Sequence, residues 1–220
     1  MPEYKLTPDN WRSWPQRFFE CEDSAPDEEF YREPRKVVHL DMYALQAVTD
    51  LYRELLPANG VILDLMSSWR SHFPSEVTYQ RVIGLGLNYR EMADNPDLFK
   101  HVVHNLNLNE PLPFEDELFD AAVCCVSVQY MQRPVETFIE VARVLKPGAP
   151  FILTFSNRCF PSKAINLWNS TDDRAHSQIV ALYFRASGQF DGLMYQDRSP
   201  GPQFDPLWAV WGRKRVMSNE

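Results

Sequence analysis

Residues 112–156 read LPFEDELFDAAVCCVSVQYMQRPVETFIEVARVLKPGAPFILTFS, and this stretch decides the fold. An apolar run over 121–128, rich in β-branched and small residues, predicts a strand buried on both faces. Arg133-Pro134 then opens a helix, because a proline in the first turn lacks only an N–H that has no partner there. Pro147-Gly148 ends that helix, and 151–155 form a second apolar run. Strand, helix and strand predict a βαβ unit and therefore a parallel sheet.

The same stretch also carries a family resemblance. Phe119-Asp120, followed by Glu140-x-x-Arg143-Val-Leu-Lys-Pro-Gly and an apolar run, closely resembles class I S-adenosylmethionine-dependent methyltransferases between their fourth and fifth strands. The resemblance is to the small-molecule type 11 branch, and it can be followed from about Leu40 to Lys214. It implies an α/β fold, namely a Rossmann-like, doubly wound, seven-stranded, mostly parallel sheet with an antiparallel last strand. It also implies S-adenosylmethionine as the cofactor.

The composition and net charge of the chain restrict the classes of molecule that it can bind. The chain has 220 residues, of which 45% are hydrophobic, enough for one sizeable core. The net charge of −8 argues against nucleic acid or an anionic membrane as the partner. No apolar run approaches the roughly 18 residues that a bilayer span requires. The seventeen prolines and the aromatic N-terminal residues suggest a covered pocket, and together with the type 11 resemblance they lead us to expect a small-molecule substrate, whereas the sequence does not indicate an oligomeric state.

Cysteine usage indicates a reducing compartment. The four cysteines lie at 21, 124, 125 and 159, and the polar, proline-rich N-terminal residues lead us to expect no signal peptide. Cys124 and Cys125 are neighbours in a predicted strand, so their side chains point to opposite faces and cannot ligate one ion together. With no other ligand spacing of His and Cys, we expect no metal site, reduced thiols and a cytoplasmic location.

Three segments are expected along the chain. Residues 1–36 combine acidic, proline-rich stretches with many aromatic residues and predict an N-terminal cap that packs on the core, over the active site or merely over sheet-edge helices. Residues 37–215 form the methyltransferase-like α/β domain, and 216–220 form a tail. Periodicity within the domain predicts helices over 40–55, 89–93 and 175–186, a short helix within 69–79, and strands over 61–65, 81–85, 101–103, 190–195 and 207–211.

The loop after the first strand is the first predicted cofactor contact, because ligands bind at the carboxyl ends of parallel strands. The resemblance implies an acid followed by three glycines in this loop. The acid matches Asp64, but the glycines fall on Met66, Ser68 and Arg70. Serine hydroxyls, including that of Ser67, and backbone N–H groups remain able to bind a carboxylate, and Arg70 can pair with it.

The next two strands end in neutral residues. Where the family places a ribose-binding acid, this chain has Gly86, with Asn88 two residues later. Where the family often has Asp for the adenine amine, the chain has Asn105, and Leu106 would pack on the purine. A helix cap at Asn88 and a loop turn at Asn105 are the alternative interpretations.

The remaining predicted site residues follow the fourth and fifth strands or lie beside the first helix and first loop. Ser127 is predicted to contact the cofactor, and Gln129 and Tyr130 to meet donor and acceptor, although Gln cannot accept a proton near neutral pH. A packed aromatic role is the alternative for Tyr130. Further candidates are His72 as a base and four substrate contacts, for which structural histidines and a loop ion pair are the alternatives: His39, Tyr43, Arg158 and Lys163.

Two function classes follow, and a third is weaker. The leading hypothesis is an S-adenosylmethionine-dependent methyltransferase acting on an unidentified small molecule. The alternative is a methyltransferase-fold protein without transferase activity, serving as a ligand-binding or scaffold partner, and the lost glycines and ribose acid favour it. A nucleotide-binding oxidoreductase has little support, because no G-x-G-x-x-G follows the first strand.

Overall fold

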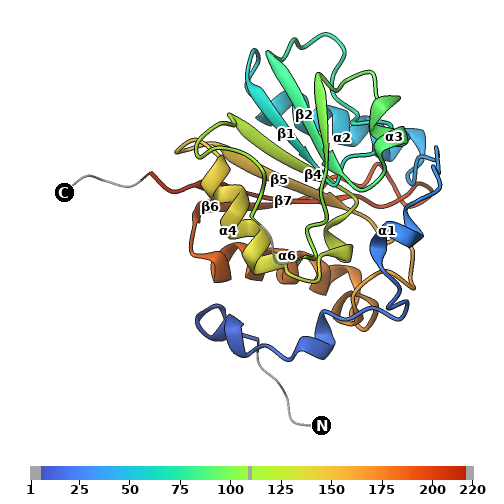
Figure 1. Ribbon diagram of the computed structural model, residues 1–220, viewed down its shortest axis with the longest axis vertical. Coiled ribbons are helices and arrows are strands. Elements are labelled where there is room, and N and C mark those ends of the chain that lie inside the picture. Colours follow the sequence, from blue (N-terminus) through green and yellow to red (C-terminus); the bar gives the residue numbers. More distant parts are fainter. Residues whose placement is uncertain (1–5, 109–110, 217–220) are drawn as a thin grey trace.

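A seven-stranded sheet forms the centre of the molecule in the computed structural model, which describes residues 6–108 and 111–216 (Figure 1). Residues 1–5 of the predicted cap and 217–220 of the predicted tail lie outside the described part. The strand order is β3-β2-β1-β4-β5-β7-β6, and only the pairings of β7 are antiparallel. This confirms the expected α/β class, with strands β1 Val61–Leu65, β2 Arg81–Gly86, β3 Lys100–Val103, β4 Ala121–Cys125, β5 Pro150–Phe155, β6 Phe190–Asp197 and β7 Trp208–Lys214.

Helices cover both faces of the sheet and bury an apolar core on each. Leu63 and Leu65 of β1 face the core under α4 (Pro134–Val144) and α6 (Asp173–Ser187), whereas Ile62 faces the core under α2 (Met42–Leu55). This alternation follows from the two-residue period of a strand. Figure 1 shows α4 and α6 together on one side of the sheet and α2 on the other.

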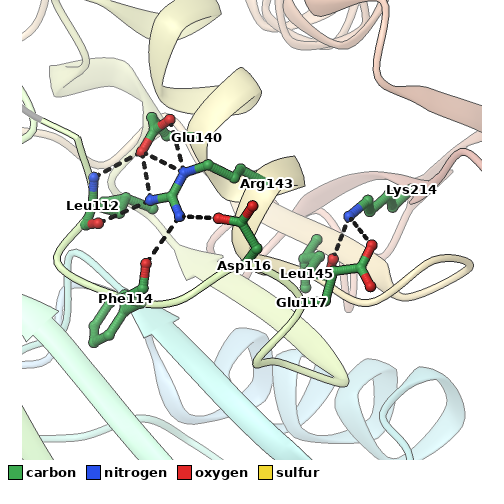
Figure 2. Close-up of polar contacts among 8 residues, drawn as sticks. All are labelled: Leu112, Phe114, Asp116, Glu117, Glu140, Arg143, Leu145 and Lys214. Carbon is green, nitrogen blue, oxygen red and sulfur yellow. Dashed lines mark hydrogen bonds and ion pairs between the residues drawn. The ribbon is translucent and has the colours of Figure 1, made fainter.

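Arg143 explains why the opening stretch is so distinctive. Its guanidinium donates to the carbonyl oxygens of Leu112 and Phe114, both at 2.9 Å, and pairs with Glu140 at 2.8 Å (Figure 2). It also pairs with Asp116 at 2.6 Å. The Glu140-x-x-Arg143 pair on α4 therefore fixes the loop that leads into β4, at a place remote from the carboxyl ends of the strands.

Two predicted elements differ from the observed ones. The apolar run 121–128 does not stay extended: β4 ends at Cys125, Val126 takes a left-handed conformation with φ of +46°, and a 3₁₀ turn follows over Val128–Tyr130. No helix forms within 69–79. His72 in this segment takes a left-handed conformation with φ of +62°, which a right-handed helix does not accommodate, so the segment stays irregular.

The N-terminal residues lie against the α/β core in two places. Short 3₁₀ helices at Pro8–Ser13 and Gln16–Phe18 approach α6, where the rings of Trp14 and Phe19 lie 6.4 Å from that of Tyr183. Residues 21–37, which we call the strap, then include α1 (Asp27–Phe30) and contact the carboxyl ends of the strands. The remaining helices are α3 (Tyr89–Ala93) and α5 (Asn166–Asn169).

Two further observations concern the chemistry of the chain. All four cysteines are free thiols in the structure. Across the described residues, none of the helices combines the length and apolar character that crossing a membrane requires.

Candidate functional site

A loop tied by side-chain hydrogen bonds follows β1. The carboxylate of Asp64 is buried, and its Oδ2 atom accepts hydrogen bonds from the hydroxyls of Ser67 and Ser71, each at 2.6 Å. Asn95 donates to the Ser68 carbonyl at 2.8 Å and to the Ser71 hydroxyl at 2.9 Å. Burial raises the pKa of Asp64 to about 6, although the two serine hydroxyls oppose this shift. The serines therefore organise a loop that has no glycine.

The loop after β1, which lacks the family's glycines, follows a path that also explains why β2 ends without an acid. Met66 adopts φ of +57°, a left-handed conformation that glycine adopts at lower cost. The Ser67 N–H then donates to the Leu85 carbonyl at 2.8 Å, which draws the loop onto the end of β2. A Cβ atom at Gly86 would lie 2.2 Å from the Ser67 carbonyl oxygen. No side chain fits at position 86 while the loop follows this path.

One cavity of about 160 Å³ lies at the carboxyl ends of the strands. It is centred where the strand order reverses between β1 and β4, the usual ligand site of open parallel sheets. All nine residues predicted to bind the cofactor line it, namely Asp64, Met66, Ser67, Ser68, Gly86, Asn88, Asn105, Leu106 and Ser127. Residues that are far apart in sequence thus meet at one place.

The amides of Asn88 and Asn105 contact the strap. Asn88 caps α3 by accepting from the Glu91 N–H, and its Nδ2 donates to the Tyr31 carbonyl at 2.7 Å. Asn105 donates to Glu28 at 2.7 Å, and its Oδ1 accepts from a backbone N–H two residues later. Each therefore has the turn or cap role of the alternative interpretation while also lining the cavity.

Lys163 binds the strap through hydrogen bonds and an ion pair. Its ammonium group is buried and donates to the carbonyl oxygens of Asp23 and Ala25, at 3.1 and 2.7 Å. It also lies 3.3 Å from the carboxylate of Asp27, which accepts from Asn107 at 2.8 Å on its other oxygen. Lys163 lines the cavity, but its hydrogen bonds go to the strap.

The predicted catalytic residues divide into two groups. His72 and Tyr130 line the cavity. Burial lowers the pKa of His72 to about 4, so its imidazole is neutral at pH 7, and burial raises the pKa of Tyr130 to about 12. Gln129 is fully buried outside the lining, and its Nε2 donates to the Val126 carbonyl at 2.8 Å.

The predicted substrate contacts also divide. His39 lines the cavity and packs edge-on against Phe160, with ring centroids 5.0 Å apart, and burial lowers its pKa. Tyr43 instead packs on Phe204 of the loop between β6 and β7, with ring centroids 4.0 Å apart. Arg158 pairs with Asp205 at 2.7 Å beside a separate surface hollow. Neither Tyr43 nor Arg158 lines the cavity.

Sequence reasoning missed several lining residues. The most important is Glu91, whose carboxylate accepts from the Ser68 hydroxyl and from the Arg35 N–H, each at 2.5 Å. A helix N-cap followed three residues later by Glu is a helix-start signature, and Asn88 with Glu91 has that spacing. This signal was available, but it indicates only a helix start. Tyr31 and Arg35 of the strap line the cavity as well.

Part of the chain matches a known protein family. Residues 75–153 match the family model described as a methyltransferase domain. The match begins after the serine-rich loop, so the part of the site that departs most from the family lies outside it. Family match and strand order together confirm the resemblance, and the chain has the fold of class I S-adenosylmethionine-dependent methyltransferases.

Individual relatives are distant. A stretch of 67 residues is 36% identical to the biotin biosynthesis bifunctional protein BioHC of Teredinibacter turnerae, covering 30% of this chain but only 12% of that protein. An S-adenosylmethionine-dependent methyltransferase from Mesorhizobium loti has a TM-score of 0.55 at 17% identity, over 77% of this chain and 100% of that one. A chain from the complex of a Haloferax volcanii methyltransferase with its activator Trm112 scores 0.59 at 12% identity, over 81% and 92%. These structural likenesses concern the fold.

Proposed function

We propose that this protein is an S-adenosylmethionine-dependent methyltransferase that acts on a small molecule enclosed at the carboxyl ends of the strands. The observation that carries the proposal is the convergence of nine predicted cofactor contacts with His72 and Tyr130 on one cavity. These residues follow four different strands, so they line one cavity only because the fold brings the ends of those strands together. The methyltransferase domain match over 75–153 supports the same activity.

The chemistry of the cavity fits S-adenosylmethionine. The cofactor carries an ammonium group, a carboxylate, a ribose diol and a purine. The cavity offers the carboxylates of Asp64 and Glu91, hydroxyls of three serines and the amide of Asn105, with Leu106 beside it. Carboxylates suit the ammonium and the diol, and the amide with its apolar neighbour suits the purine, whereas the three serine hydroxyls already donate to Asp64, Glu91 and the Cys125 carbonyl.

The chain's own residues would position an acceptor and receive its proton. Bound S-adenosylmethionine supplies an already activated methyl group, so orientation and exclusion of water dominate the remaining work. The imidazoles of His39 and His72 are neutral at pH 7 and can accept a proton, whereas Tyr130 keeps its own. Tyr130 is held in place because its hydroxyl accepts from the Phe160 N–H at 2.8 Å.

The strap favours a small substrate. Tyr31, Arg35, Val37 and Val38 line one side of the cavity, and the Trp69 indole donates to the Val37 carbonyl at 2.9 Å. A cavity closed on this side suits a molecule of a few rings or a short chain better than the surface of a macromolecule. We therefore infer that the acceptor enters the cavity whole.

A ligand-binding or scaffold protein with the methyltransferase fold is the second candidate. It is favoured by the contacts of the strap with Asn88 and Asn105, since both amides already have partners. It is also favoured by the Ser67 carbonyl, which lies against Gly86. On this hypothesis the cavity holds another ligand or only solvent.

Native mass spectrometry of the purified protein separates the two candidates. The enzyme is expected to carry or to take up S-adenosylhomocysteine, and Asn105→Ala should weaken that uptake because the purine loses a hydrogen-bond partner. Gln46→Ala, an exposed amide on α2, is the matched control and should bind as the wild type does. A different copurified ligand, together with no uptake of S-adenosylhomocysteine, would favour the scaffold.

A further inference from the structure

We propose that Glu91 is the acid that binds the ribose diol of the cofactor, from the first turn of α3 instead of from the end of β2. The inference rests on the proposed function, because it concerns how this chain would hold S-adenosylmethionine. Glu91 lines the cavity together with Gly86, Asn88 and Leu106. It was not among the residues that the sequence pattern pointed to.

The end of β2 cannot supply the acid itself. A Cβ atom at Gly86 would lie 2.2 Å from the carbonyl oxygen of Ser67 and 3.2 Å from the sulfur of Met92. The first of these contacts is with backbone, which cannot move aside as a side chain can. The loop is fixed at this place by the hydrogen bond from the Ser67 N–H to the Leu85 carbonyl. A carboxylate facing the cavity from this region must therefore come from the connection after β2 or from α3.

Glu91 has the geometry and the free capacity for a diol. One carboxylate oxygen accepts from the Ser68 hydroxyl and the other from the Arg35 N–H. These two partners fix the orientation of the carboxylate, yet each oxygen of an ionised carboxylate can accept a second hydrogen bond. Both partners are neutral, so the negative charge of Glu91 stays available to strengthen hydrogen bonds from two hydroxyl groups.

The other two carboxylates that line the cavity already bind other groups of the protein. Asp27 is occupied by the Lys163 ammonium at 3.3 Å and by Asn107 at 2.8 Å. Asp64 holds the loop through Ser67 and Ser71 and lies buried at the base of the cavity. Asp64 also has only neutral partners, but its carboxylate is buried, whereas Glu91 is partly exposed and has a neutral partner on each oxygen.

The test combines a protein change with a ligand change. Isothermal titration would measure S-adenosylhomocysteine and its 2′-deoxy analogue against the full chain and against Glu91→Gln, which keeps the size of the side chain. We expect wild type to bind the deoxy analogue about tenfold more weakly, as one charge-assisted hydrogen bond is lost. Glu91→Gln should weaken S-adenosylhomocysteine by about the same factor and remove most of the preference for the 2′-hydroxyl.

The control is Asp94→Asn at the residue that follows α3. Asp94 pairs with Lys36 of the strap but does not line the cavity, so its loss should leave the preference for the 2′-hydroxyl unchanged. Equal weakening of both ligands by Glu91→Gln would show that Glu91 acts only through the loop or the strap and would overturn the proposal. A wild type that binds both ligands equally well would also overturn it. If neither ligand binds wild type, the proposed function itself fails.

Discussion

At the scale of single residues, the carbonyl of Ser67 and the hydrogen atoms of Gly86 decide what the site can hold. The path of the loop after β1 and the absence of an acid on β2 are coupled, because a Cβ at position 86 would lie 2.2 Å from that carbonyl. Restoring the family's acid at this position without the glycines should therefore harm the fold and leave binding no better.

Gly86→Asp tests this coupling. We expect the free energy of unfolding to fall by about 2–4 kcal/mol, since the new side chain must displace the loop backbone. Gly188→Ala is the matched control: Gly188 has φ of +67° with nothing near its missing Cβ, so only backbone strain of about 1 kcal/mol is added. Urea denaturation of both variants gives the comparison. A Gly86→Asp protein as stable as wild type would contradict the account.

Asp64 should also make stability depend on pH. Its folded pKa of about 6 lies above the ordinary aspartate value, so the folded state binds the proton more tightly than the unfolded state. The Asp64 contribution of about 3 kcal/mol is therefore fully present only below about pH 4, and it is lost progressively as pH rises from about 4 through about 6.

Urea unfolding of wild type and Asp64→Asn between pH 4 and pH 7 measures that contribution. Carboxylates with lowered pKa values are common to both proteins and cancel in the difference. The free energy of unfolding of wild type minus that of the variant should decrease as pH rises. A difference that is constant over this range would contradict a raised pKa for Asp64.

At the scale of elements, the strap is joined to the cavity chiefly by side chains of the core. Lys163 is its central support, with two carbonyl oxygens and the Asp27 carboxylate as partners. Removing the ammonium would leave the buried carboxylate of Asp27 without its cation, which is costly.

Lys163→Met should therefore release the strap. We expect a loss of about 3 kcal/mol in stability and faster hydrogen exchange over residues 23–35, with the central strands still protected. Arg158→Met removes an exposed arginine from its pair with Asp205 and should cost less than about 1 kcal/mol. Hydrogen exchange detected by mass spectrometry measures the protection of residues 23–35 in both variants. Unchanged exchange over 23–35 in Lys163→Met would contradict this role.

The helices and strands could be predicted from the sequence far more fully than the side-chain contacts of the candidate site. Strand β1 and helix α3 match their expected bounds, because apolar periodicity and an Asn cap are local signals. The missing helix within 69–79 and the early end of β4 coincide with the left-handed residues His72 and Val126, which no local pattern reveals. The partners of Asn88 and Asn105 lie on the strap, more than fifty residues away, so their contacts are not legible in the sequence.

At the scale of the whole molecule, a methyltransferase-like scaffold carries a cavity whose lining departs from the family pattern. Arg143 and the turn after α4 hold the scaffold at the end of the sheet opposite the cavity, which is why the most recognisable stretch carries little chemistry. The cavity is built instead from the serine-rich loop, the neutral ends of β2 and β3, and the strap. We propose that the cavity built in this way still binds S-adenosylmethionine.

Isothermal titration of the full chain with S-adenosylhomocysteine measures whether the cavity binds this cofactor product. We expect saturable binding of about one equivalent, and weaker binding in the Asp64→Ala and Asn105→Ala variants. Absence of heat with wild type at about millimolar ligand, a concentration at which even a weak complex forms, would contradict it.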